Sequence, residues 1–127
     1  MTTPPTPSVT GPSFLALQVR DVEASAVFYE THLGLTRAAQ SPPGAVVFTT
    51  SPIAFAVRNP TPGTDLDSGP AGLGVALWMV CDDAQALHDN LAAAGVPILV
   101  APFPGPFGLT FVLRDPDGYA VTLHNAA

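Results

Sequence analysis

The chain has 127 residues, of which 47% are hydrophobic and only 11% are charged. This length suits one domain, or two small halves that share a core, and the composition supplies ample apolar material for that core. The formal net charge is −6 and no basic run occurs, which argues against nucleic acid and anionic membranes as partners. The single cysteine excludes an internal disulfide and a cysteine-rich zinc site.

The N-terminal stretch is rich in proline and lacks the apolar segment of a signal peptide. No apolar run in the chain is long enough to span a bilayer. We therefore expect a cytoplasmic protein in which residues 1–12 form an extended N-terminal arm.

The first half, residues 13–59, predicts one strand, one helix and three further strands. Apolar residues on alternate positions from Phe14 to Arg20 indicate the first strand. Asp21 is a suitable N-cap for a helix that ends near Gly34, because glycine readily adopts the left-handed conformation that follows a helix. The remaining strands are expected over 35–39, 45–50 and 53–58.

Residues 60–72 contain many prolines, glycines and aspartates and hardly any apolar residue, so they predict a linker. The pattern then restarts in the second half, residues 73–127, where Asp82 or Asp83 caps a helix that ends near Gly95. The strands expected in this half are 73–81, 98–101, 109–113 and 119–124, with a loop over 102–108.

The spacing from Asp21 to Gly34 equals the spacing from Asp82 to Gly95, and each pair brackets a helix between strands. The two halves therefore form an internal repeat of the βαβββ pattern. A four-stranded sheet with one helix leaves its other face uncovered, so two such modules must pair, within the chain or across a homodimer. The predicted fold class is α+β, with paired βαβββ modules that enclose a ligand cleft.

Asp115-Pro116-Asp117-Gly118 predicts the tight turn of the last hairpin, because proline fixes φ early in the turn and glycine supplies the positive φ that ends it. The first helix carries the motif Asp21…Ser25…Phe28-Tyr29…Leu33-Gly34. With this motif and the final turn, the chain resembles the vicinal oxygen chelate superfamily. That group includes glyoxalase I, extradiol dioxygenases, fosfomycin-resistance transferases and bleomycin-resistance proteins. The resemblance covers residues 13–125 and implies paired βαβββ modules, usually in a homodimer.

Enzymes of this superfamily typically hold a divalent metal through histidine and glutamate side chains on the sheets. A metal site needs several imidazole or carboxylate ligands that converge on one ion. The side chains at the corresponding positions of this chain cannot bind such an ion, so we expect no metal and no cofactor. We also expect no catalytic residue, because the sequence has no nucleophile elbow, HExxH motif or phosphate loop. The resemblance places the four ligand positions at Phe14, at Ala54 or Ala56, at Ala76 or Val75, and at Thr122.

Strand alternation indicates which side chains would line the cleft. The expected lining is aromatic and apolar with a few polar tips, which suits a flat ligand held by stacking. Trp78 belongs to the core instead if the register of its strand differs by one residue, and the loop with Phe103 and Phe107 either covers the cleft as a lid or packs on the fold. The predicted ligand-binding residues are Phe14, Gln18, Phe48, Arg58, Trp78, Phe103, Phe107, Thr122 and His124.

The sequence favours a non-catalytic protein whose partner is a small-molecule natural product or metabolite. The resemblance implies a role like that of bleomycin-resistance proteins, in which a homodimer sequesters an aromatic or cationic natural-product antibiotic. Two alternatives remain open. One is a glyoxalase-like lyase, isomerase or dioxygenase with a non-standard or lost metal site, and the other is a sensor of a small metabolite.

Overall fold

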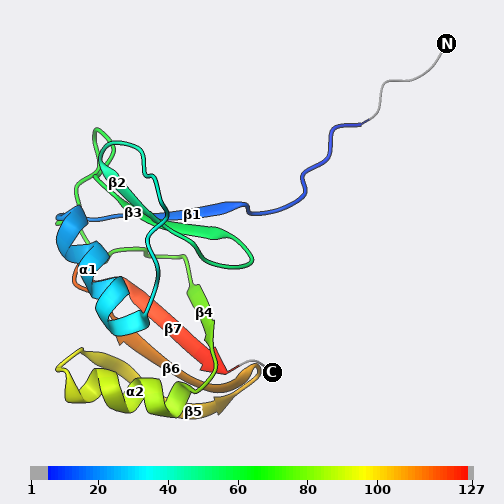
Figure 1. The fold of residues 1–127 in the computed structure, drawn as a ribbon, viewed down its shortest axis with the longest axis vertical. Helices are drawn as coiled ribbons and strands as arrows, with labels where there is room; N and C mark the ends of the chain where they lie inside the picture. Colours follow the sequence, from blue (N-terminus) through cyan, green and yellow to red (C-terminus); the bar gives the residue numbers. More distant parts are fainter. Residues whose placement is uncertain (1–5, 126–127) are drawn as a thin grey trace.

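The computed structural model describes residues 6–125 and shows two α+β modules, the first above the second in Figure 1. The predicted α+β fold class is confirmed. No helix among these residues is long and apolar enough to cross a membrane. The first module contains β1 (Phe14–Gln18), α1 (Val22–Leu33), β2 (Ala45–Phe48) and β3 (Ala54–Arg58). The second contains β4 (Leu77–Cys81), α2 (Ala84–Ala93), β5 (Ile98–Gly105), β6 (Gly108–Arg114) and β7 (Ala120–Asn125).

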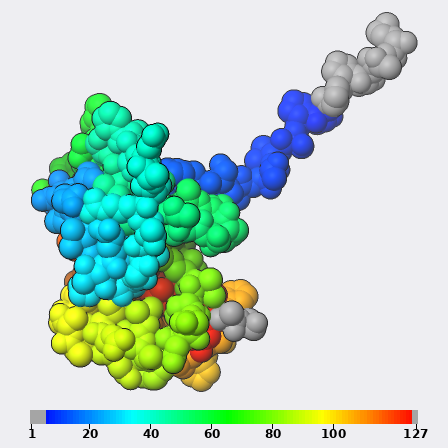
Figure 2. Space-filling view, in the orientation of Figure 1, coloured from blue at the N-terminus to red at the C-terminus, as the bar shows by residue number. Residues whose placement is uncertain are grey.

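Residues 6–13 have no helix or strand and extend away from the body of the protein, as Figures 1 and 2 show. Their side chains are exposed, and Val9 keeps 94% of its surface accessible. The predicted arm also includes residues 1–5, which lie outside the described part of the chain.

Both sheets have the same strand order, which is the structural counterpart of the repeat in the sequence. The second sheet has the order β4-β7-β6-β5, with β4 parallel to β7. The first has the order β1-β3-β2, with β1 parallel to β3. A bridge between Arg37 and Phe48 occupies the fourth position. The strand predicted over 35–39 is thus reduced to this bridge, flanked by two backbone hydrogen bonds of 2.8 Å.

The segment predicted as a loop over 102–108 instead belongs to β5 and β6, which meet at a tight turn at Pro106-Phe107. Pro102 and Pro104 favour a loop in the sequence, because proline cannot donate a backbone hydrogen bond. β5 is the edge strand of its sheet, so one side of its backbone has no neighbouring strand and needs no donors. Prolines are tolerated there for that reason.

β4 is shorter than predicted, since the strand expected over 73–81 begins only at Leu77. Gly72 and Gly74 adopt positive φ angles of 70° and 84°, so the backbone before β4 turns instead of extending. Residues 59–76 therefore form an irregular segment without helix or strand between the modules.

Aspartate caps the start of each helix, as predicted. The side chains of Asp21 and Asp83 each accept a hydrogen bond of 3.0 Å from a backbone N–H in the first helical turn. The cap of α2 is therefore Asp83 and not Asp82. Gly34 ends α1 with a φ of 69°, a left-handed value that favours glycine.

Each helix covers one face of its own sheet, and α1 lies where the modules meet (Figure 1). Tyr29, Phe48 and Phe55 form the aromatic centre of the first core, with ring centroids between 5.0 and 6.3 Å apart. Four side chains from α1 and β4 pack against both cores and join the modules through apolar contact. They are Phe28, Leu33, Leu77 and Met79.

The turn after β6 joins the modules as well as closing the last hairpin. Asp115 is buried, with 3% of its surface exposed. One carboxylate oxygen accepts hydrogen bonds from the backbone N–H groups of Asp117 (2.9 Å) and Tyr119 (2.8 Å), and these shape the turn. The other accepts a hydrogen bond of 2.7 Å from the hydroxyl of Tyr29, on α1. Burial raises the pKa of Asp115, and burial together with this carboxylate raises the pKa of Tyr29.

Arg20 makes a second connection between the modules. Its guanidinium forms an ion pair of 3.2 Å with Asp117 of the turn and one of 2.7 Å with Asp67 of the intervening segment. The hydroxyl of Tyr119 also donates a hydrogen bond of 2.6 Å to the backbone carbonyl of Gln18. The end of β1, the intervening segment and the final hairpin are therefore held together by polar contacts.

Candidate functional site

The open face of the first sheet carries a pocket of about 420 Å³. Its floor contains Ala16, Ala45 and Ala56, one from each strand, and their short side chains leave a hollow in the sheet surface. Phe14 and Arg58, both predicted as ligand-binding residues, are part of the lining. Phe14 remains 50% exposed, so its ring is available to a ligand. The rest of the lining consists of Pro42, Pro43, Gly44, Val47 and Asn59.

The open face of the second sheet carries an aromatic cluster that we call the Trp78 cluster. It consists of Trp78, Phe107 and His124, whose ring centroids lie 5.8–5.9 Å from one another. Trp78 is 43% exposed and Phe107 is 52% exposed, so both rings keep surface that a ligand or another protein can cover. All three residues were predicted from the sequence to bind ligand, and the fold brings them together from β4, the β5–β6 turn and β7.

Backbone contacts fix the orientation of the His124 ring. Its Nδ1 atom lies 2.7 Å from the carbonyl oxygen of Asn125 and 3.1 Å from that of Phe107. A carbonyl oxygen only accepts hydrogen bonds, so Nδ1 must carry the hydrogen. The neutral ring therefore has its unprotonated nitrogen at Nε2, for which the described residues provide no hydrogen-bond partner.

Arg58 and His124 occupy equivalent positions in the two sheets. Arg58 pairs with Gln18, three residues before the cap Asp21. His124 pairs with Val80, likewise three residues before the cap of α2. Each open face thus has a side chain with ring or guanidinium nitrogens at the same place in its βαβββ repeat.

Thr122 and Phe103 lie on the open face of the second sheet, although neither belongs to the Trp78 cluster. Thr122 on β7 is the cross-strand partner of Trp78 and is partly buried. Phe103 on β5 pairs with Thr110, which in turn pairs with His124. Phe103 is 38% exposed, and it sits within β5 instead of the predicted loop.

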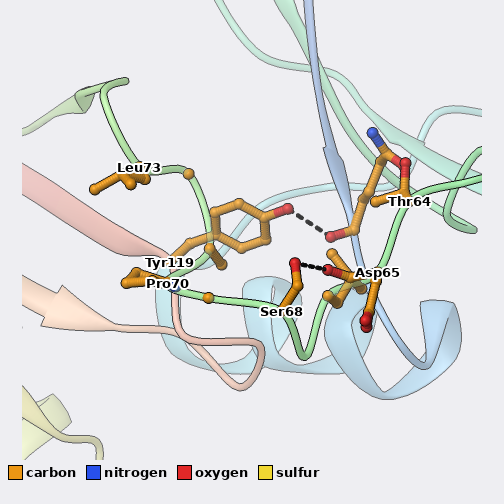
Figure 3. A pocket seen from close by; sticks show the side chains of 11 residues that line it. Thr64, Asp65, Ser68, Pro70, Leu73 and Tyr119 are labelled. Carbon is orange, nitrogen blue, oxygen red and sulfur yellow. Dashed lines mark hydrogen bonds between the residues drawn. The ribbon is translucent and has the colours of Figure 1, made fainter.

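Gln18 takes part in a different hollow, of about 380 Å³, between the intervening segment and the last hairpin (Figure 3). Its Oε1 atom accepts hydrogen bonds from the backbone N–H (2.7 Å) and the hydroxyl (3.1 Å) of Thr61. Figure 3 shows the ring of Tyr119 beside this hollow, with its hydroxyl in the hydrogen bond to Gln18. Gln18 therefore holds the intervening segment on the sheet and does not line the pocket that contains Phe14.

Phe48 lies in the core, contrary to the prediction that it lines the cleft. Its side chain is fully buried among Tyr29 and Phe55, on the face of the first sheet that α1 covers. Alternation along β2 places Val47 on the opposite, open face. A ligand on the open face has no route to the ring of Phe48.

The side chains at the superfamily's metal-ligand positions do not fit a divalent ion. Phe14 and Ala54 are paired across β1 and β3, and Ala56 follows in the pocket floor. The cap at Asp83 places the third position at Ala76, which has no donor atom. Among residues 6–125, no three His, Cys, Asp or Glu side chains are grouped so that they could hold a metal ion.

Of the residues that line the first-sheet pocket, only Phe14 and Arg58 are among the predicted ligand-binding residues. Ala45 and Val47 are missing from the predicted lining, as are Pro42, Pro43 and Asn59. The alternation of β2 was a usable indication for the first two, because it gives Ala45 and Val47 one face and Val46 and Phe48 the other. The pocket also depends on the positions of the segments before β2 and after β3, and the alternation within a strand does not determine those positions.

A family model described as the Glyoxalase/Bleomycin resistance protein/Dioxygenase superfamily matches residues 11–123. Among curated proteins, no sequence matches the chain significantly.

Solved structures with the same fold come from proteins of different activities. An antibiotic-binding protein from Streptomyces sp. CB03234, TnmS3, has a TM-score of 0.74 and 20% identity, over 96% of this chain and 100% of that one. The fosfomycin resistance protein FosX from Listeria monocytogenes has a TM-score of 0.73 and 14% identity, over 94% and 96%. A lactoylglutathione lyase from Agrobacterium tumefaciens has a TM-score of 0.67 and 19% identity, over 92% and 94%. Identities this low show a shared fold and leave the activity open.

Proposed function

Because this chain belongs to the Glyoxalase/Bleomycin resistance protein/Dioxygenase superfamily, we propose that it is a non-catalytic binding protein. Its ligand is an aromatic or cationic natural-product antibiotic, which it sequesters in a cleft between βαβββ modules. The observation that carries this proposal is the Trp78 cluster, an exposed set of three mutually contacting rings on an open sheet face. Such rings suit a flat ligand, because stacking adds about 0.5–1.5 kcal/mol per aromatic contact beyond the area buried.

The proposed assembly is a homodimer. Nine large apolar side chains on the two sheets, the β5–β6 turn and the segment before β4 are 38–81% exposed, a surface that a monomer in water would rarely leave uncovered. The first-sheet pocket and the Trp78 cluster belong to different modules, and a second copy would cover both faces. The nine residues are Phe14, Leu73, Val75, Trp78, Val80, Leu99, Val100, Phe103 and Phe107.

We expect light scattering of the purified chain to give the mass of a dimer, twice 13.0 kDa. A stable protein interface buries about 800 Å² on each partner, and the exposed apolar faces are the surface available for it. Replacing Val80, 57% exposed on β4, with aspartate is expected to shift the mass toward that of the monomer. The matched control is Val27→Asp on the outer face of α1, where the side chain is 46% exposed. A monomeric wild-type chain would contradict the proposed assembly.

Replacing Trp78 with alanine is expected to weaken antibiotic binding by about tenfold or more, since it removes the largest ring of the cluster. Isothermal titration with aromatic natural-product antibiotics, bleomycin and fosfomycin measures this effect. Trp78 is the only tryptophan, so its intrinsic fluorescence reports on the same site. Tight binding of an antibiotic without its chemical conversion supports sequestration, and the absence of binding by every antibiotic tested contradicts it. The control is Val27→Ala, at an exposed side chain of α1, which should leave antibiotic binding unchanged.

A second candidate function is that of a superfamily enzyme, a lyase, isomerase or dioxygenase, with a non-standard or lost metal site. The observation in its favour is the free Nε2 atom of His124, which is placed to accept a proton beside two aromatic rings. Conversion of a bound ligand by the wild type, lost in His124→Phe while binding persists, would favour this candidate over sequestration.

A further inference from the structure

The first-sheet pocket contains a single ionisable side chain, that of Arg58. Its other lining residues are small, apolar or neutral, with Phe14 at one side and alanines across the floor. A guanidinium beside an otherwise uncharged hollow is the strongest electrostatic feature that a ligand in this pocket would meet.

Arg58 has no carboxylate partner among residues 6–125, unlike two of the other arginines. Arg20 pairs with aspartates and Arg37 pairs with glutamates. The Nε atom of Arg58 donates a hydrogen bond of 3.0 Å to the carbonyl oxygen of Asn59, which restrains the guanidinium. Its two terminal amino groups have no acceptor among the described residues, and a planar guanidinium presents them in the geometry that a carboxylate or sulfonate accepts.

The carboxylates of the described chain are elsewhere. Several serve as helix caps or as partners of Arg20 and Arg37, and Asp115 is bonded to Tyr29. None of them lines the first-sheet pocket. A cationic ligand in this pocket would therefore meet a like charge and no compensating acid.

We propose that the first-sheet pocket selects aromatic ligands that carry an anionic group, and that Arg58 binds this group. The inference rests on the proposed binding function and narrows its ligand class from aromatic or cationic compounds to aromatic acids. The ring of the ligand lies over the alanine floor beside Phe14, and its carboxylate, phenolate or sulfonate accepts hydrogen bonds from the terminal amino groups of Arg58. Charge-assisted hydrogen bonds of this kind are stronger than neutral ones.

Two fluorescent probes with one ring skeleton test this inference. Anilinonaphthalene sulfonate carries an anionic group, and phenylnaphthylamine has the same rings without it. At an ionic strength of about 0.15 M, where the net negative charge is largely screened at long range, we expect the wild type to bind the anionic probe about tenfold more tightly than the neutral one. Arg58→Gln is expected to abolish this preference, because it weakens the binding of the anionic probe far more than that of the neutral one.

Two control variants locate the effect. Arg114→Gln removes another arginine that has no ion pair among the described residues and lies outside the pocket, so the preference for the anionic probe should persist. Ala45→Phe places a ring in the hollow and should weaken the binding of both probes. Its fold is checked by urea denaturation.

The outcomes separate this inference from the proposed function. An equal affinity of the wild type for both probes, a preference that survives Arg58→Gln, or probe binding that Ala45→Phe leaves as tight as in the wild type overturns the selection of anions by Arg58 in this pocket. The absence of binding of either probe overturns both the anion selection and a ligand pocket on this sheet.

Discussion

Replacing Phe48 with alanine is expected to lower the free energy of unfolding by about 4 kcal/mol. The ring is fully buried between Tyr29 and Phe55, so truncation removes aromatic contacts and leaves a cavity under α1. Urea denaturation monitored by circular dichroism measures the change. An unaltered slope of the unfolding free energy against urea concentration would show that the unfolded state is unaffected. Ligand affinity of the folded fraction is expected to stay the same, because the open face does not contain this side chain.

Val47→Ala is the matched control for Phe48→Ala. Val47 is the preceding residue of β2, partly exposed on the open face, and it lines the first-sheet pocket. Its truncation is expected to cost less than about 1.5 kcal/mol and to alter ligand binding instead. A small stability loss with a large affinity loss for Phe48→Ala would show that the ring faces a ligand after all.

Replacing Asp115 with alanine is expected to lower the free energy of unfolding by about 3 kcal/mol. The substitution removes the acceptor of the Tyr29 hydroxyl and of two backbone N–H groups, and it leaves the buried hydroxyl without a partner. A buried donor without an acceptor costs about 1–3 kcal/mol, and the turn loses the contacts that shape it. The loss should weaken the joint between the modules, because Tyr29 belongs to the first module and Asp115 to the second.

A double-mutant cycle separates the contribution of the Tyr29–Asp115 hydrogen bond from that of the contacts within the turn. Tyr29→Phe removes only the hydroxyl and is expected to cost about 1–2 kcal/mol in the wild type and much less in Asp115→Ala, since the hydrogen bond is already absent there. Asp82→Ala, at an exposed aspartate that is not the cap of α2, is the control and should change stability by no more than about 0.5 kcal/mol. Additive losses for Tyr29 and Asp115 would show that their hydrogen bond does not contribute to stability.

The Asp-Pro-Asp-Gly turn has more than a local role, because two of its side chains contact the first module. The sequence predicts a hairpin turn at Asp115, and the turn residues account for that geometry. The tertiary structure adds contacts from Asp115 to Tyr29 and from Asp117 to Arg20, over 86 and 97 residues of sequence. Turn chemistry depends on neighbours in the chain, whereas these partners are close only after both modules have folded.

The sequence by itself determined the fold class, the repeat and the faces of most strands. A cap at Asp21 begins the first helix and Gly34 ends it, because these residues satisfy or terminate helical backbone through local geometry, whereas the structure chose Asp83 over Asp82 as the cap of the second. Alternation placed Phe14 and His124 on open faces, since successive side chains of a strand point to opposite sides. For Trp78 it left the open face and the core as alternatives, between which the structure decided.

Only the tertiary structure decided which of these side chains meet and which are covered. It brought Trp78, Phe107 and His124 into one cluster. Phe107 reaches this cluster from the β5–β6 hairpin, which the sequence did not predict because the prolines of the edge strand β5 favour a loop. The tertiary structure also buried Phe48 under α1 and engaged Gln18 with the segment between the modules. Local patterns describe one element at a time, whereas proximity and burial depend on how separate elements pack against one another.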